Sequence, residues 1–240
     1  QGSVTDTAGF LASTLNIKDD DFIRGNYVFT SQNAQGIENH GLIHAGRDGN
    51  IILIAPHIEN SGILQSDGGQ IVLATGEKLT ISSLDSQEVS FQIQAPSNHV
   101  LNIGTILADR GGAVDVFAGS IRHSGVISAE GISVDEQGNI RLVAQGDITL
   151  EAASVTHANG PQGGAVHVES STETTLVSGA VSATGSAGTG GRVELLGERV
   201  GLLEGATVNV SGQNGGGVAL VGGDFQGGNI GVRNAINTYF

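Results

Sequence analysis

Short apolar segments and polar corners alternate along this chain with an even spacing. Within a segment such as residues 70–74 (QIVLA), apolar side chains recur at every second position and β-branched residues dominate, which is typical of strands. Segments of this kind begin at Ile37, Ile58, Leu79, Val100 and Ile121, which are evenly spaced. Three more begin at Ile148, Thr174 and Val200, with a second and longer even spacing. A repeat of this kind built from short strands predicts an all-β fold, a β-solenoid with roughly eight or nine coils of about 21 to 27 residues.

The alternation also predicts which side chains fill the core. We expect the inward positions to include Ile51, Leu53, Ile71, Leu73, Val114 and Val116. A leucine-rich repeat has a similar length, but it needs leucines at fixed spacings and a helical apolar stripe, and neither is present. The chain has 39 glycines, and pairs such as Gly68-Gly69 and Gly111-Gly112 recur where a coil must bend. These glycines therefore indicate turns, and no segment has the pattern of a phosphate-binding loop.

Four polar residues occupy equivalent positions of successive repeats. They are Asn39, Asn60, Asn102 and His123. Stacked coils place equivalent residues about 4.8 Å apart, so this column can form a ladder of side-chain hydrogen bonds. We interpret it as structural.

Composition excludes several classes of function. The net charge is −14 with only ten Lys and Arg, so no basic surface for nucleic acid is expected. No apolar run of about 18 residues occurs, which argues against membrane insertion. The chain contains no cysteine, which fits an exported protein and offers no zinc pattern.

The segment 1–36 does not follow the repeat, and it carries a resemblance to a known family. The runs GFLASTLNI at 9–17, DDDF at 19–22 and GNYVF at 25–29 resemble the secretion-domain region of filamentous-haemagglutinin-type exoproteins of two-partner secretion. The repeats IENHGLIHA and IENSGIL and the ending GGDFQG at 222–227 extend this resemblance over most of the chain. The Asn-Pro-Asn motifs that precede this region in the family are missing, so the segment is expected to be unable to direct its own secretion.

The resemblance implies a right-handed parallel β-helix that an outer-membrane transporter partner exports from a Gram-negative-type bacterium. It implies a secreted or cell-surface protein, an adhesin scaffold or adhesive stalk with haemagglutinin-like or biofilm roles, and no enzymatic activity. We divide the chain into an N-terminal cap or secretion-domain remnant (1–36), β-helix coils (37–224) and a C-terminal cap or lead into further repeats (225–240).

Several charged residues could serve either catalytic chemistry or ordinary surface roles. A carbohydrate-active β-helix enzyme, a lyase or hydrolase, would need converging acids, and the candidates are Asp109, Arg110, Asp115, Glu130 and Asp135. Because Asp115 alternates with apolar neighbours and the aligned column carries Ile52 or Val72, His167, Glu194 and Ala219, we interpret these acids as solvated surface charge.

Metal and haem sites were considered on the same basis. Residues 19–21 are three adjacent aspartates, which suit a helical start or polar corner better than a Ca²⁺ site. His40, His44 and His57 cluster in sequence but lack an apolar pocket for haem. We therefore predict no cofactor and no metal.

Lengthened corners offer the one candidate recognition surface. They fall near 132–137, 156–162, 184–189 and 211–214, on one side of the solenoid. The corner residues that we name as candidates for a host or matrix glycan or protein receptor are Thr156, His157, Asn159 and Gln162. Plain solvated turns are the simpler interpretation of them. End-to-end self-association into a surface filament is a further alternative, because the end coils of a solenoid carry unpaired strands.

Overall fold

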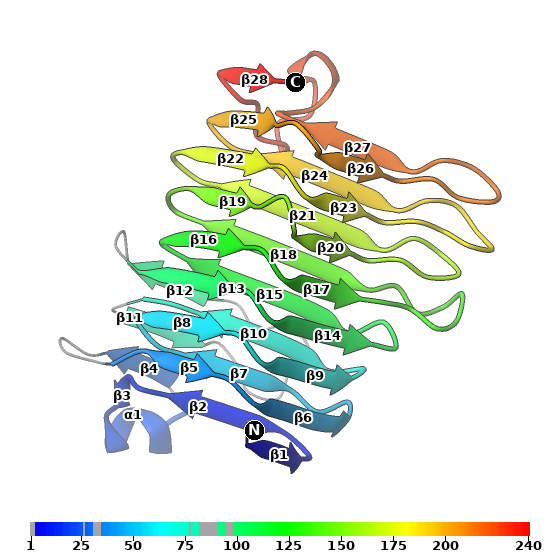
Figure 1. Ribbon diagram of the computed structural model, residues 1–240. Helices are drawn as coiled ribbons and strands as arrows, with labels where there is room; N and C mark the ends of the chain where they lie inside the picture. Colours follow the sequence, from blue (N-terminus) through cyan, green and yellow to red (C-terminus); the bar gives the residue numbers. More distant parts are fainter. Residues whose placement is uncertain (1–2, 26, 31–34, 77, 82–90, 95–97) are drawn as a thin grey trace.

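The computed structural model describes residues 3–25, 27–30, 35–76, 78–81, 91–94 and 98–240. Apart from the helix α1 (Asp19–Ile23) and the 3₁₀ turn η1 (Phe225–Gly227), the regular structure is β. Strands from successive coils stack in parallel into three long faces, so the protein is a parallel β-helix, with the two ends of the chain at opposite ends of the stack (Figure 1).

Three eight-stranded parallel sheets form the faces of the described helix. The first sheet contains β5 (Ile37–Asn39), β8 (His57–Asn60), β13 (His99–Asn102), β16 (Ser120–His123), β19 (Ile148–Leu150), β22 (Thr174–Val177), β25 (Arg199–Leu202) and β28 (Asn237–Tyr239). The second contains β1 (Val4–Thr7), β6 (Leu42–Arg47), β9 (Ile63–Asp67), β14 (Thr105–Asp109), β17 (Val126–Ala129), β20 (Val155–His157), β23 (Ala180–Ser182) and β26 (Thr207–Asn209). The third contains β2 (Phe10–Ser13), β7 (Ile51–Ile54), β10 (Gln70–Ala74), β15 (Ala113–Ala118), β18 (Asn139–Ala144), β21 (Ala165–Ser170), β24 (Arg192–Leu196) and β27 (Val218–Val221).

The observed register agrees with most of the repeat found in the sequence and corrects two positions. The column of the first sheet that starts at Ile37 continues through Ile58, Val100, Ile121, Ile148, Thr175 and Val200. Thr175 therefore replaces the expected Thr174. Leu79 does not belong to this column, because Ile58 pairs directly with Val100. The step between those two is double the step from Ile37 to Ile58, so an excursion from the helix happens to have the length of one repeat.

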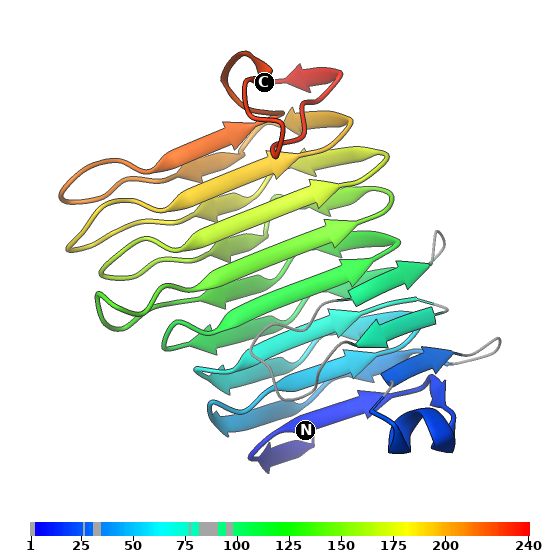
Figure 2. The ribbon, with the colours of Figure 1, turned by 180° about the vertical axis from the view of Figure 1, so that it is seen from behind.

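That excursion completes a small antiparallel sheet beside the helix (Figure 2). Its strands, in the order β12-β11-β4-β3, are β3 (Asn16–Ile17), β4 (Tyr27–Thr30), β11 (Lys78–Ile81) and β12 (Phe91–Gln94). The helix α1 lies between β3 and β4 and has three aspartates in its first turn, where the helix dipole favours negative charge. Leu15 and Phe29, on either side of α1 in sequence, are buried. The end of GFLASTLNI and the run GNYVF thus contribute β3 and β4 to this small sheet, and DDDF forms α1 between them.

Residues that show no repeat in the sequence also join the helix. Strand β1 pairs in parallel with β6, and β2 pairs in parallel with β7. Residues 4–13 therefore extend the second and third sheets at the N-terminal end of the stack, although their sequence lacks the alternation seen later in the chain.

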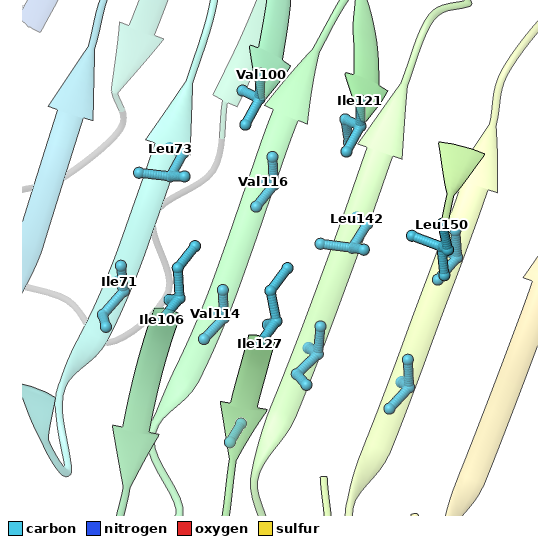
Figure 3. Packing of buried hydrophobic residues seen from close by; sticks show 14 of the residues in the cluster. Ile71, Leu73, Val100, Ile106, Val114, Val116, Ile121, Ile127, Leu142 and Leu150 are labelled. Carbon is cyan, nitrogen blue, oxygen red and sulfur yellow. The ribbon is translucent and has the colours of Figure 1, made fainter. Parts of the chain in front are cut away.

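The core lies between the three sheets and consists of aliphatic side chains stacked on their equivalents (Figure 3). The six residues that the alternation places inward are all 1% exposed or less, which confirms that prediction. The pairs in β7, β10 and β15 are in register, so Leu53, Leu73 and Val116 contact one another along a single column. Each buried methylene contributes about 0.8 kcal/mol, and the repetition of such columns holds the coils together.

Two corners between the second and third sheets need a left-handed backbone. Gly68 has φ +90° and Gly111 has φ +76°, conformations that cost glycine little. Arg110 precedes Gly111 with φ +57°, so it lies in a turn, as its sequence position indicated.

The core column predicts a large difference between two leucine truncations. Leu73→Ala removes a fully buried side chain and should lower the free energy of unfolding by about 2 to 5 kcal/mol. Leu203→Ala, at a position that is 45% exposed, is the matched control and should change it by about 0.5 kcal/mol or less. Chemical denaturation followed by circular dichroism measures both values. Equal effects of the two substitutions would show that the coils do not depend on this column.

Candidate functional site

The lengthened corners form a continuous structure on one side of the helix. Residues 158–164, 183–191 and 210–217 connect the second and third sheets and lie above one another at the same side in Figure 1; we call them the loop stack. Parallel bridges join Gly160 to Gly185 and Gly185 to Gly212. Backbone hydrogen bonds such as Gly185 N to Ser211 O, 3.0 Å, continue the β pairing into the loops. The loop stack is therefore an ordered extension of the coils.

Close packing explains why these loops are rich in glycine. A Cβ on Gly191 would lie 1.9 Å from the carbonyl oxygen of Gly164, and one on Gly217 would lie 1.9 Å from that of Gly191. Both distances are far below van der Waals contact, so any side chain would push adjacent loops apart. Glycine is needed here for the approach of one backbone to another.

The four corner residues named as a candidate recognition surface are used mainly within the protein. Thr156 is fully buried on the inward face of β20, so it cannot contact a ligand and is removed from that surface. Asn159 Oδ1 accepts hydrogen bonds from the backbone N–H and the hydroxyl of Thr184. Gln162 Nε2 donates to Thr189 Oγ1 at 2.5 Å. His157 Nε2 lies 3.4 Å from a carboxylate oxygen of Glu130.

The column of three asparagines and a histidine is a chain of side-chain hydrogen bonds inside the helix. Asn39 Nδ2 donates to Asn60 Oδ1, and Asn60 Nδ2 donates to Asn102 Oδ1, each at 2.8 Å. Asn102 Nδ2 lies 3.1 Å from His123 Nδ1. All four side chains are buried, and the backbone carbonyl oxygen of each asparagine also accepts from two backbone N–H groups of the next coil.

The position of His123 at the end of this ladder sets the neighbours of both ring nitrogens. Nδ1 lies 3.1 Å from Asn102 Nδ2 and 3.3 Å from the Asn102 carbonyl oxygen, and Nε2 lies 3.4 Å from the Val155 carbonyl oxygen. An amide donor at Nδ1 and a carbonyl acceptor at Nε2 suit a neutral ring with its proton on Nε2. Burial lowers the pKa of His123 below 6.5, against the opposing effect of the nearby Asn102 and Val155 carbonyls. The imidazole is therefore neutral in the folded protein at neutral pH.

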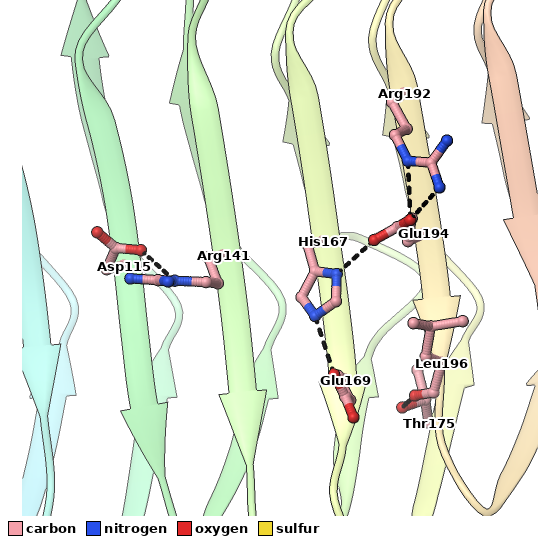
Figure 4. Close-up of polar contacts among 8 residues, drawn as sticks. All are labelled: Asp115, Arg141, His167, Glu169, Thr175, Arg192, Glu194 and Leu196. Carbon is pink, nitrogen blue, oxygen red and sulfur yellow. Dashed lines mark hydrogen bonds and ion pairs between the residues drawn. The ribbon is translucent and has the colours of Figure 1, made fainter. Parts of the chain in front are cut away.

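A second polar column runs along the outward face of the third sheet, and the sequence overlay found most of it but not Arg141 (Figure 4). It starts beside Val72 and continues through Asp115, Arg141, His167 and Glu194 to Leu220. Leu220 stands where Ala219 was expected, because the corner 203–206 before β26 is two residues longer than the equivalent corner 178–179, whereas the loop before β27 is one residue shorter than the loop before β24. Aligning the apolar pair Val114 and Val116 with Ile140 and Leu142 would have placed Arg141 next to Asp115.

Asp115 faces outward, as expected, but it is only 6% exposed, so it is not a solvated surface charge. Its Oδ1 accepts from Arg141 Nε at 2.8 Å, and its Oδ2 accepts from the side-chain amide of Gln70. The Arg141 guanidinium also lies 4.9 Å from the centre of the Phe117 ring. These two partners, one of them a cation, thus compensate for the loss of water around this carboxylate.

His167 lies between two carboxylates further along the same column. Its Nδ1 is 2.7 Å from Glu194 Oε2, and its Nε2 is 3.1 Å from Glu169 Oε2. Burial disfavours the imidazolium, but hydrogen bonds to the two glutamates and their charges outweigh it and raise the pKa of His167 above 6.5. The pKa of Glu169 is lowered, chiefly by its hydrogen bond to His167. Burial acts to raise the pKa of Glu194, but its bonds to His167 and Arg192 outweigh that effect and lower this pKa as well.

The acids considered for catalysis have separate partners. Asp115 pairs with Arg141, and Glu130 lies beside His157. Burial and the neighbouring carboxylate of Asp67 raise the pKa of Asp109. Asp135 is exposed on the corner that precedes β18. The structure therefore does not gather these acids around one point.

The histidines considered for haem are likewise distributed. His40 contacts Ser61 and Glu38 beside the first sheet, whereas His44 lies 3.0 Å from Asp6 on the second. Among the described residues, no group of three or more His, Cys, Asp or Glu side chains is arranged to hold a metal ion. Of the helices in the described part of the chain, none is long and apolar enough to cross a membrane.

These features define the protein as a parallel β-helix with an added antiparallel sheet, buried polar columns and a glycine-rich loop stack. A solved structure to which this chain is similar is the crystal structure of the HMW1 secretion domain from Haemophilus influenzae. It matches with a TM-score of 0.72 and 31% sequence identity over 100% of this chain. The match covers 58% of that chain. No protein-family model and no curated protein matches the sequence.

The neutral His123 predicts that acid destabilises the ladder. A histidine whose pKa is lowered by folding takes up a proton more readily when unfolded, so the free energy of unfolding should fall as the pH decreases below 6.5. His123→Asn keeps an acceptor for Asn102 and a donor toward Val155 but cannot be protonated. We expect this variant to fold and to lose less stability between pH 7 and pH 5 than the wild type, as measured by denaturation at each pH. An unchanged pH profile would contradict the assignment.

The charged His167 predicts the opposite dependence. Its raised pKa gives stability that is fully present below pH 6.5 and is lost as the pH rises through its folded pKa. The lowered pKa values of its two glutamates give stability that is present above pH 4.5 and is lost on acidification. His167→Gln should therefore destabilise the protein most between about pH 4.5 and 6.5 and progressively less at alkaline pH. Denaturation of the variant and the wild type in parallel tests this, and a pH-independent difference would refute it.

Proposed function

We propose that this chain is the secretion-domain region of a two-partner-secreted surface exoprotein and serves as the scaffold or stalk of an adhesin. The observation that carries the proposal is the match along the whole chain to the HMW1 secretion domain, at 31% identity. The motifs of residues 9–29 that resemble two-partner-secretion exoproteins support it, because they form one continuous part of the fold, from β2 at the end of the β-helix through β3, α1 and β4. In this proposal the partner during export is an outer-membrane transporter, and the protein reaches the surface or surroundings of a Gram-negative bacterium.

The physical character of the fold suits such a route. Each coil packs mainly on its neighbours, so folding can advance along the chain as successive coils emerge from a pore. The chain has no cysteine, so no disulfide can form and close a loop before transport. The free energy gained by each new coil then favours forward movement of the chain.

A scaffold role is supported by how the polar side chains of the loop stack are used. Asn159 and Gln162 bond to the adjacent loop, and Thr156 is buried, so they stabilise the stack and are not free for a sugar. The dispersed acids support a non-enzymatic role over a lyase or hydrolase. In this proposal a receptor for host or matrix glycans or proteins lies on other parts of the exoprotein.

Export in the presence and absence of a transporter tests the proposal. The exoprotein that in this proposal contains the chain is produced with a signal peptide in a Gram-negative host, with or without the two-partner transporter of its own organism. We expect it in the medium only when the transporter is present. Phe29→Ser, which places a polar group in the buried part of the small sheet, should reduce export several-fold, whereas Leu203→Ala should leave it unchanged.

Binding of the purified chain to the periplasmic domains of the same transporter provides a second readout. Equal amounts in the medium with and without the transporter, together with no binding, would overturn the proposal. The folded state of each variant is checked by circular dichroism, so that a loss of export can be separated from general unfolding.

A further inference from the structure

Two histidines on adjacent coils form a pair on the outer face of the first sheet. His57 in β8 and His99 in β13 are directly opposed in register, and Ile58 and Val100 beside them point into the core. Their ring centroids are 4.4 Å apart with an interplanar angle of 33°. Both residues are exposed to solvent. Two imidazoles thus stand side by side where solvent and solutes can reach them.

The ring nitrogens of this pair differ from those of the other histidines. Within the described part of the chain, neither His57 nor His99 has a side-chain hydrogen bond or an ion pair. Each of the other five has at least one such contact, and they are His40, His44, His123, His157 and His167. The lone pairs of the imidazole pair are therefore available to a ligand.

The surroundings of the pair suit a cationic ligand. The carboxylate of Glu59, two residues after His57 on β8, interacts electrostatically with His99. A neutral imidazole is the form that binds metals, and a nearby carboxylate attracts a cation. On the adjacent coils, Ser120 occupies the position equivalent to His99 and Gly36 lies against His57. Small residues therefore flank the pair on both sides.

We propose that His57 and His99 jointly bind one divalent transition-metal ion, with water completing its coordination. Imidazole nitrogens suit Cu²⁺, Ni²⁺ and Zn²⁺. In the general order of affinities among divalent ions, Cu²⁺ is the ion that is bound most tightly. The in-register pairing places the two exposed rings side by side, so each can offer one nitrogen to a shared ion. Two protein ligands make this an open, exchangeable site, unlike a closed structural zinc site with four ligands.

The location of the pair gives metal binding a structural consequence. Strands β8 and β13 belong to consecutive coils, but the excursion to the small antiparallel sheet separates them in sequence. An ion held by both histidines would join the coil before the excursion to the coil after it. A ligand that binds only the folded state stabilises it by an amount that rises with the logarithm of the free ligand concentration above its Kd, so the ion would stabilise the re-entry of the chain into the β-helix.

Titration of the purified protein with Cu²⁺ tests this inference, by calorimetry and by electron paramagnetic resonance of the bound ion. We expect one saturable site with nitrogen ligands. His57→Gln and His99→Gln should each weaken binding at least tenfold. His40→Gln is the matched control, because His40 is also exposed but already contacts Glu38 and Ser61, and it should leave the affinity unchanged.

Thermal unfolding with and without Cu²⁺, followed by addition of a chelator, supplies a second measurement. The wild type should show a reversible increase in Tm that both His57→Gln and His99→Gln lack. The inference is overturned if no saturable site is found, if the three variants lose affinity equally, or if the two pair variants bind like the wild type. In that case the rings are only stacked surface side chains.

Discussion

The whole structure depends on parallel, in-register stacking of equivalent residues from successive coils. In this arrangement the nearest neighbour of most side chains is the side chain at the same position one coil away. A column of aliphatic residues satisfies this constraint easily, because like packs on like, as Leu53, Leu73 and Val116 do. A column of polar residues needs complementary partners at each step of the stack, since equal charges repel and unpaired buried groups are costly.

The chain pairs its stacked polar side chains in two ways. Inside the helix, amides serve as both donor and acceptor, so Asn39, Asn60 and Asn102 can stack in a line with every step bonded. On the outside of the third sheet the sign alternates from Asp115 to Arg141, and His167 meets Glu194. Both columns therefore place titratable histidines in defined surroundings, one held neutral and the other held charged.

The sequence predicted the class of fold and the inward residues, because period-two alternation and a fixed repeat follow directly from stacked strands. The prediction was wrong where a strand outside the β-helix happened to have the spacing of the repeat. Leu79 fell on the regular step of the repeat although its strand pairs with β4 and β12 in the small antiparallel sheet. The shielding of Asp115 was also missed, since Gln70 and Arg141 are distant from it in sequence and only the register brings them together. At the candidate corner the residue types suggested sugar binding, whereas stacking of the loops had already engaged Asn159 and Gln162.

The small antiparallel sheet imposes an order on folding that the coils alone would not impose. Strand β4, near the start of the chain, pairs with β11, which follows only after all the strands from β5 to β10, and β12 closes the far side. The coils between them can form one after another, but this sheet stays incomplete until Gln94, the last residue of β12, is available. The N-terminal end of the stack therefore reaches its final stability in one late step, so a nascent chain has a minimum length below which its first coils lack lateral support.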